Sequence, residues 1–542
     1  MRKQILKGTL ILTIAGLIAR VIGLYNRVFL ANVISAAELG LYQLIFPVLA
    51  VCMAVCCYGI EAALSKTVAE QNAKKCFSEM QHTTHVGLSL ALGLSMLISF
   101  CVYIGSQPIA KYFLQETACV PYLKIMALAI PFSTIHACVS GYFLGIGKAT
   151  IPALSQLIEQ IVRVATIYRF IYEFYPNGGA NARTAVWGLV TGELVSCLFS
   201  VISYKISACI QKWREEIIKG GYKKNDCKHA DDTNNFQKNN YQVKNHQLNS
   251  YQIKHPQIFL NLCALALPIT VNRLLTTILS SLEAVLIPVM LKVYYGDSVT
   301  ALEIFGIVTG MAFPFIMFPT TLTNALATML LPAVSDAGAR NDYETVKSTV
   351  SKSVHYCILI GILAMTLFFV YGNLLGIIVF KNDTAGYFLR RFAFLCPFIY
   401  CASVFSSTLN GLGRVKITLV NHLISLIVRI AFLIFAVPKL GVTGYLWGMM
   451  AGYLLLVVLN GNAVYRLTGL DVSPLKTMIF PGLFAVMASI FSLGIYQMIL
   501  HRFVVPVIVA ALISCVALAL LYLGMLFAGG IIGRKPKSFA FR

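Results

Sequence analysis

The chain is dominated by apolar runs long enough to cross a bilayer. A transmembrane helix needs about 20 apolar residues, because each residue rises only about 1.5 Å along the axis. Of the 542 residues, 58% are hydrophobic and only 12% are charged. This composition predicts an all-α polytopic membrane protein with about fourteen transmembrane helices. The expected spans are 9–31, 39–62, 84–106, 121–144, 151–174, 184–207, 258–282, 301–330, 353–375, 387–410, 416–437, 441–463, 475–499 and 504–529.

Basic residues indicate the orientation. An even number of spans places both termini on one side of the membrane, and most of the 43 Lys and Arg residues fall in loops of that side, such as Lys66, Lys148 and Arg340. The positive-inside rule therefore predicts that both termini are cytoplasmic. The net charge of +22 then reflects topology and not nucleic-acid binding. The first apolar run is longer than the core of a signal peptide, so we expect a retained span.

An internal repeat predicts the architecture. Residues 131–165 align without gaps on residues 397–431, and the match includes Arg163 with Arg429. Six expected spans separate the copies, an even number, so they are parallel repeats. We expect two six-helix lobes followed by two further helices. The predicted domains are an N-terminal lobe 1–208, a linker 209–256, a C-terminal lobe 257–470, two helices in 471–530 and a basic cytoplasmic tail 531–542.

The predicted linker is polar and rich in Lys, Asn and Gln. Such a composition cannot bury a core, so we expect a disordered basic cytoplasmic segment. Two interpretations of it remain open. It is either a tolerated insertion between the lobes or a basic cluster that attracts anionic headgroups.

Three arginines lie inside expected spans. Arg20 and Arg27 belong to the first and Arg273 to the seventh. An arginine at the bilayer centre costs about 2.5–3.5 kcal/mol on insertion scales, so it usually faces a bundle interior or a watery cavity. The planar guanidinium binds phosphate oxygens in pairs. We therefore predict a cavity site between the two halves for a diphosphate or another multivalent anion, with Asn26 and Asn272 beside the arginines.

Alternatives remain for two of these arginines. Arg27 lies near the outer end of its span, where a long side chain can extend to the headgroups. Arg20 can instead pair with a buried acid such as Glu61 or Glu283.

Further charges in the spans are candidates for ion pairs or for coupling. Glu159 precedes Arg163 by four residues, the favoured order for a pair within one helix. Arg429 has Ser425 at the corresponding position, so its partner lies elsewhere or it faces water. Glu193 is a lone acid that either carries a coupling proton or packs within its bundle. Glu61 and Glu283 complete this set of candidate coupling or structural residues.

Two prolines and the cysteines deserve separate interpretations. Pro314 and Pro319 remove backbone hydrogen bonds from an expected cavity-lining helix, where a bend would let the halves rock. Kinks without gating are an equal alternative.

The 15 cysteines lie mainly inside apolar runs, with no spacing typical of zinc or of a disulfide framework. We therefore expect no metal and no cofactor.

Several stretches resemble one family. They are KGTLILTIAGLIARVIGLYNRVFLA, ELGLYQLIFPVLAV, LGIGKATIP, LNGLGRVKI and GMAFPFIMFPTTLTNALATMLLPAVSDA. The chain is similar to the polysaccharide biosynthesis and stage V sporulation protein B-like branch of the MOP (multidrug/oligosaccharidyl-lipid/polysaccharide) flippase superfamily, related to MurJ-type lipid II flippases. The resemblance implies a fourteen-helix exporter of the MATE/MurJ type. It also implies that lipid-linked sugar precursors, such as lipid II, move from the inner to the outer leaflet.

The chain departs from the MurJ type in two places. The first-helix arginines, Arg20 and Arg27, are seven residues apart here and six in that type. The eighth-helix arginine of that type has no counterpart in GMAFPFIMFP, and Arg273 substitutes for it one helix earlier.

The predicted function is a flippase of the bacterial plasma membrane that works by alternating access, for peptidoglycan or polysaccharide synthesis. It would be no enzyme, and H⁺, Na⁺ or the membrane potential would drive it. The expected partners are a lipid-linked oligosaccharide, membrane lipids and cell-wall synthesis proteins, but no nucleic acid, and we expect a monomer. The alternatives are a cation-coupled multidrug exporter of the MATE type and a non-transporting membrane scaffold for sporulation or wall synthesis.

Overall fold

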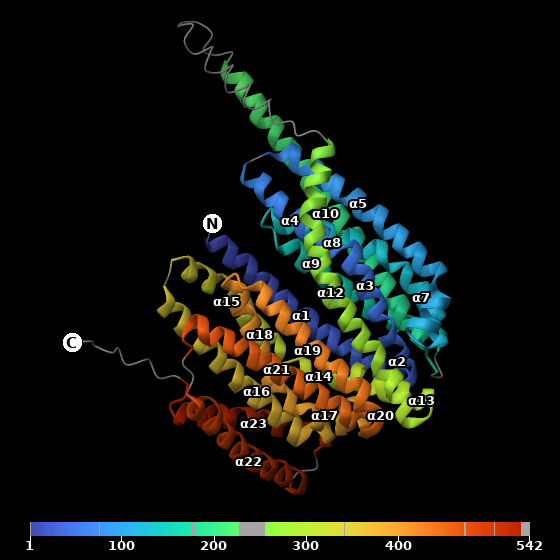
Figure 1. The fold of residues 1–542 in the computed structure, drawn as a ribbon, viewed down its shortest axis with the longest axis vertical. Coiled ribbons are helices and arrows are strands. Elements are labelled where there is room, and N and C mark those ends of the chain that lie inside the picture. Colours follow the sequence, from blue (N-terminus) through green and yellow to red (C-terminus); the bar gives the residue numbers. More distant parts are fainter. Residues whose placement is uncertain are drawn as a thin grey trace, which may run out of the picture. The chain divides into compact units, whose positions relative to one another are not determined.

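A computed structural model describes residues 2–74, 76–175, 179–226, 255–340, 342–470, 473–502 and 505–532. The described residues are almost entirely helical, and their one β-bridge joins Ile34 to Ala180 (Figure 1). The chain divides into two compact units. Two long helices contribute to both units: α1 (Arg2–Val33) passes from the first to the second after Ala19, and α12 (His255–Tyr295) does so after Ile278.

The first unit comprises the remaining helices up to residue 226, apart from one short helix. They are α3 (Phe46–Cys56), α4 (Tyr58–Ala73), α5 (Phe77–Ile104), α6 (Ser106–Pro108), η1 (Ile109–Phe113), η2 (Thr117–Cys119), α7 (Val120–Ala127), α8 (Ala129–Gly145), α9 (Thr150–Phe174) and α10 (Ala182–Asp226).

The second unit holds α2 (Ala36–Leu44) and the C-terminal helices. The latter are α13 (Ser298–Gly306), η3 (Ile307–Ala312), α14 (Phe313–Met317), α15 (Thr320–Ala339), α16 (Tyr343–Phe380), α17 (Asp383–Phe392), η4 (Ala393–Leu395), α18 (Cys396–Gly411), α19 (Val415–Phe435), α20 (Val437–Leu440), α21 (Val442–Thr468), η5 (Leu475–Ile479), α22 (Phe480–Arg502) and α23 (Val507–Ala528).

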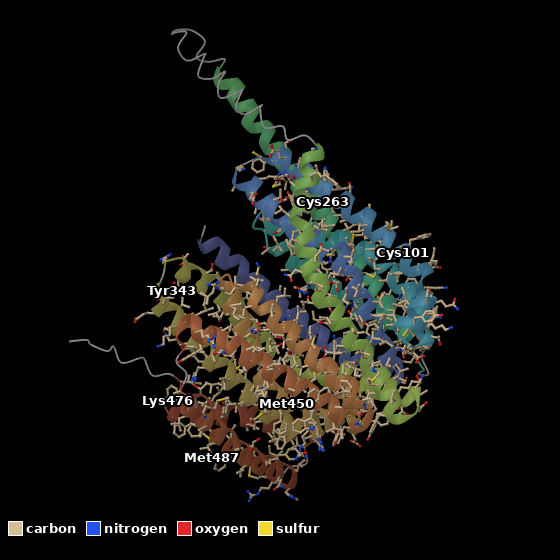
Figure 2. All side chains as sticks on the ribbon, viewed as in Figure 1. Cys101, Cys263, Tyr343, Met450, Lys476 and Met487 are labelled. Carbon is tan, nitrogen blue, oxygen red and sulfur yellow. The ribbon has the colours of Figure 1, made fainter. Side chains whose placement is uncertain are left out.

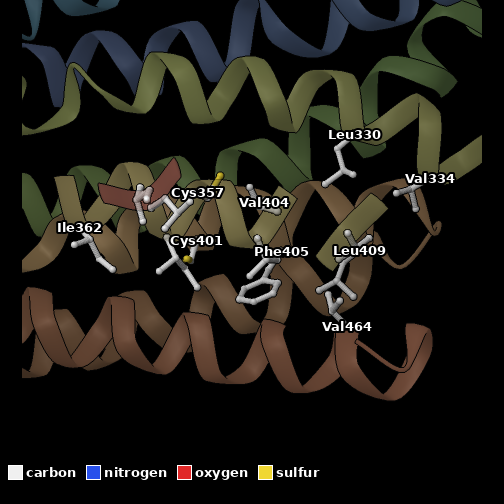
Figure 3. Packing of buried hydrophobic residues seen from close by; sticks show 14 of the residues in the cluster. Leu330, Val334, Cys357, Ile362, Cys401, Val404, Phe405, Leu409 and Val464 are labelled. Carbon is white, nitrogen blue, oxygen red and sulfur yellow. The ribbon is translucent and has the colours of Figure 1, made fainter. Parts of the chain in front are cut away.

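Each unit has its own apolar core. In the first unit, Leu64 and Met80 are fully buried against Tyr142, whose ring meets that of Tyr204 edge-on at 4.9 Å. In the second unit, α15, α16, α18 and α21 bring together Leu330, Cys357, Phe405 and Val464 (Figure 3). These buried side chains hold together the helices that carry the ionisable residues.

Matched glycines explain part of the internal repeat. A Cβ on Gly145 would lie 2.7 Å from the carbonyl oxygen of Ser65, and one on Gly411 would lie 2.9 Å from that of Leu331. Glycine therefore lets α8 approach α4 in the first unit, and α18 approach α15 in the second, at the corresponding point. A larger residue at either position would force the two backbones apart.

The outward-facing side chains suit a membrane. Large apolar residues are exposed along α22 and α23, and Met487 on α22 is 47% exposed (Figure 2). Eleven helices of the described residues are long and apolar enough to span a bilayer, or twelve if the bent pair α7–α8 counts as one span. The protein is thus an all-α, multi-pass membrane protein, whereas the predicted number of fourteen spans is not confirmed. The helix α9, one of the expected spans, is not among these apolar helices, and it carries the charged residues Glu159 and Arg163 in its middle.

Two sequence-based expectations need correction. The predicted linker was placed from residue 209, but α10 stays helical to Asp226. Residues 211–219 (QKWREEIIK) are mostly good helix formers, and a charged helix can continue beyond the membrane without a core to bury. The rest of that linker, 227–254, and the tail from 533 lie outside the described residues. The single expected span 301–330 is also wrong, because the chain there forms separate helices.

The break in that segment coincides with the two prolines. Pro314 stands in the first turn of α14, and Pro319 lies between α14 and α15. Around the break, the Phe318 amide donates to the Phe315 carbonyl at 3.2 Å and the Thr321 amide to the Phe318 carbonyl at 3.1 Å. The chain thus tightens to three-residue turns where proline removes the donors. A hinge at this place stays a prediction.

Candidate functional site

Arg20 is an exposed cation on α1, in the second unit. Its Nη1 lies 3.3 Å from the hydroxyl oxygen of Thr321 at the start of α15. No carboxylate of the described residues forms an ion pair with it. The alternative in which Glu283 neutralises Arg20 is therefore wrong. The guanidinium keeps most of its five N–H donors available.

The residues one to two turns further along α1 are less accessible. Arg27 is half-buried, and Asn26 is buried with only 5% of its surface exposed. The side-chain oxygen of Asn26 has no hydrogen-bond partner among the described residues. An acceptor left unpaired in this way costs free energy unless a ligand or water reaches it.

Arg273 lies on the part of α12 that belongs to the first unit. It is exposed, like the neighbouring Asn272, and its guanidinium carbon lies 4.8 Å from the centroid of the Tyr58 ring. Such stacking orients a guanidinium while its N–H edge stays open. Within the described residues no acid pairs with Arg273. Since Arg20 and Arg273 belong to different units, a shared cavity for them stays a prediction.

A compact ionisable cluster lies between α8, α9 and α10 of the first unit. Arg163 binds Glu159 at 2.5 Å, which confirms the predicted pair within α9, and its Nη2 lies 4.0 Å from Glu193 on α10. His136 on α8 completes the cluster, with its Nδ1 3.7 Å from the Glu193 carboxylate. The side chains of all four residues are at most 14% exposed.

Hydroxyl groups hold the imidazole of His136 in place. Ser155 Oγ lies 3.0 Å from Nε2, and Ser196 Oγ lies 3.1 Å from Nδ1. Ser155 is buried and also binds the hydroxyl of Ser200 at 2.8 Å. Both ring nitrogens therefore have a hydroxyl partner, which fixes the position of the ring.

The cluster places two carboxylates beside one guanidinium and one imidazole. His136, Glu159 and Glu193 place one donor atom each within 4.8 Å of one another, a spacing that a metal ion also accepts. However, Arg163 already binds Glu159, which opposes a second cation there. Glu61 of α4 is half-buried and faces the backbone of α8 at Gly141.

Arg429 finds its partner on a distant helix. Its Nη2 lies 2.8 Å from the carboxylate of Glu283 on α12, and its guanidinium stacks on Tyr453 at 5.1 Å. Arg429 and Glu283 are 9% and 7% exposed. Arg429 matches Arg163 in the repeat, but its acid comes from α12, since Ser425 stands where the other copy has Glu159. The two copies thus neutralise the matched arginine with acids from different helices.

Sequence reasoning missed three partners in these sites. His136 lies inside the repeat, but a lone histidine carries no signal of ligand spacing. Tyr58 and Thr321 contact arginines that are far away along the chain. The serines at positions 155, 196 and 200, which contact the His136 ring or one another, are a further polar feature of otherwise apolar spans that the sequence analysis did not use.

The fold and these sites together define a class of protein. Two helical units share an internal repeat, and their apolar helices carry buried ion pairs and cations that no acid of the described residues pairs with; such an architecture is typical of secondary transporters.

Comparisons with known proteins narrow this class. The family described as "Polysaccharide biosynthesis protein" matches residues 5–228, and the family "MatE" matches residues 268–435. Stage V sporulation protein B of Bacillus subtilis is 24% identical over 476 residues, which are 87% of this chain and 85% of that protein. The lipid II flippase MurJ of the same organism is 26% identical over 172 residues, which are 30% of this chain and 32% of that protein.

Solved structures agree on the fold. The inward-closed lipid II flippase MurJ superposes with a TM-score of 0.66 at 14% identity, covering 97% of this chain and all of that one. An inward-facing MATE family multidrug resistance transporter superposes with a TM-score of 0.60 at 12% identity, covering 83% and 94% of the two chains. The chain thus matches two families over separate parts of its length, and its fold is similar to those of the MurJ and MATE structures. It is a multi-pass membrane protein that is similar in sequence to stage V sporulation protein B and, over 30% of its length, to MurJ.

Proposed function

We propose that the protein is a flippase for lipid-linked saccharide precursors, of the lipid II class, in the bacterial plasma membrane. One observation carries the proposal: Arg20 and Arg273 expose guanidinium groups from apolar helices, and no acid of the described residues pairs with either. A cation that stays unpaired inside a span suits an anionic cargo, and guanidinium groups bind diphosphate oxygens in pairs. The similarity to the lipid II flippase MurJ supports the same class of cargo.

The predicted orientation supplies a driving force. With both termini in the cytoplasm, an anionic headgroup moves outward. An inside-negative potential favours that movement by about 2.3 kcal/mol per charge per 100 mV. Alternating access then requires no hydrolysis, and the expected partners are the lipid-linked oligosaccharide, the surrounding lipids and enzymes of wall synthesis.

Translocation of lipid II in a host depleted of its own flippase tests this function. Expression of the chain should restore translocation, and Arg20→Ala and Arg273→Ala should each abolish it. Arg20→Lys should retain part of it, since the charge remains but the planar donor pair is lost. The control is Arg169→Ala, because Arg169 is exposed and pairs with Glu173 at 2.8 Å. Full activity of Arg20→Ala and Arg273→Ala would contradict the anion site.

A second candidate is a cation-coupled exporter of small molecules. The cluster of His136, Glu159 and Glu193 favours it, because carboxylates and a histidine inside a membrane span are typical of proton relays in transporters. The match of residues 268–435 to the MatE family agrees with this candidate. Drug efflux that is lost in Glu193→Gln, together with lipid II translocation that the chain never restores, would favour the exporter over the flippase.

A further inference from the structure

A pocket in the second unit is lined by none of the arginines and acids discussed above. Its volume is about 480 Å³, within the range of sites for small ligands. It forms where the C-terminal end of α12 meets the N-terminal ends of α17 and α21. These three helix ends lie together around the pocket, and the predicted orientation places them outside the cell.

The pocket has aromatic walls over a buried apolar floor. Tyr294 and Tyr295 stand edge-to-face with their ring centroids 4.9 Å apart, and both remain partly exposed. Tyr387 presents a ring that is 46% exposed, while Phe388 and Phe392 beneath it are buried. Tyrosine at such a site offers a flat apolar face together with a hydroxyl group.

One cation in this pocket has no acidic partner. The guanidinium carbon of Arg391 lies 4.7 Å from the centroid of Tyr387, which fixes its plane. No ion pair to Arg391 occurs within the described part of the chain. The neighbouring Arg390 is not part of the lining and stacks on Phe369 at 4.9 Å. The two adjacent arginines therefore differ in their surroundings.

The remaining polar groups limit the chemistry of the ligand. Asp383 and the hydroxyls of Thr384 and Thr443 also line the pocket. A carboxylate and hydroxyls are suited to a ligand with several hydroxyl groups, whereas a bare phosphate would be repelled by Asp383. An acyl chain would leave both Arg391 and Asp383 without a partner.

We propose that this pocket binds an anionic saccharide unit. The C–H face of a sugar ring stacks on the negative faces of the tyrosine rings, its acidic group binds Arg391, and its hydroxyls bind Asp383 and the threonines. A neutral sugar would use the tyrosine rings, Asp383 and the threonines, but not Arg391. The role of the pocket in transport rests on the proposed function, since the headgroup of such a cargo would meet it on the outer side, but the binding itself does not.

Calorimetric titration of the purified protein in detergent tests the binding, with glucuronic acid as the probe. Glucuronic acid should bind more tightly than glucose, and inorganic phosphate should not compete. Arg391→Gln should weaken glucuronic acid binding about tenfold or more, since a charge-assisted bond is lost, and leave glucose binding unchanged. Arg390→Gln is the matched control and should bind like the wild type.

Tyr387→Phe should keep most of the affinity and Tyr387→Ala should lose it for both sugars. Equal weakening by Arg390→Gln and Arg391→Gln would overturn the proposal, as would binding of phosphate as tight as that of glucuronic acid. Displacement of glucuronic acid by phosphatidylglycerol vesicles would identify a lipid headgroup site instead. Because binding is measured without transport, its failure is distinct from a failure of the flippase assay with Arg20→Ala.

Discussion

The buried pair between Glu283 and Arg429 allows the sharpest test of the structure. Their charged atoms are 2.8 Å apart, and at an effective dielectric constant of about 20 the attraction is about 6 kcal/mol. The cost of removing both ions from water offsets most of this, so the intact pair contributes little net stability. Removal of one partner is different, because the other charge then stays buried alone.

Glu283→Gln should therefore destabilise the protein by about 3–5 kcal/mol, the range for one broken partner of a buried pair. Arg429 already has a buried Nε without a hydrogen-bond partner among the described residues, so little compensation is at hand. The double variant Glu283→Leu/Arg429→Met removes both charges and should recover most of the loss. Thermal unfolding in detergent, followed by intrinsic fluorescence, gives the melting temperatures of the wild type, Glu283→Gln and the double variant.

Asp336→Asn is the control for this series. It breaks the pair to Arg340, which has a similar distance of 3.0 Å but lies in solvent, with side chains 53% and 67% exposed. Exposed pairs contribute about 0–1 kcal/mol, so its melting temperature should stay near that of the wild type. If Glu283→Gln unfolded at the same temperature as Asp336→Asn, or if the double variant were less stable than Glu283→Gln, the assignment of a buried pair would fail.

Two further changes test the packing of the second unit. Gly306→Leu should strongly lower the melting temperature, because a Cβ there meets the backbone of α2 at Gly40. Gly482→Leu is the control and should be tolerated, because no atom lies within 4 Å of the Cβ position of Gly482. Equal stability of the two variants would refute the close contact of α2 and α13. Asn382→Ala should cost about 1 kcal/mol, since the Asn382 oxygen caps α17 by accepting the Ala385 amide at 2.9 Å. Hydrogen exchange at Ala385 measures the loss, and unchanged protection would rule out the cap.

Local patterns made several features predictable. The Glu159–Arg163 pair depends only on a spacing of four residues in one helix, so it could be read before any tertiary contact was known. Similarly, Gly147 and Gly413 match in the repeat, and both adopt a φ of +74°, a turn that glycine allows at little cost. Both features arise within one or two turns of backbone.

Partners from distant helices were not predictable in this way. The sequence around Arg429 does not indicate that Glu283 is its partner, and the sequence around Glu193 does not indicate that His136 lies beside it. The expected span 301–330 was also not predictable in detail, because a run of apolar residues does not reveal that the break at Pro319 divides it.

The sequence by itself thus determined the membrane-embedded helical class, the duplicated plan and the charged residues that have to be accommodated, since hydropathy, repeat spacing and helix periodicity act locally. Only the tertiary structure decided which charges are neutralised and which stay available. Helix packing brings Glu283 to Arg429 and leaves Arg20 and Arg391 without an acid among the described residues, because electrostatic partners are set by distance in space and not by distance along the chain.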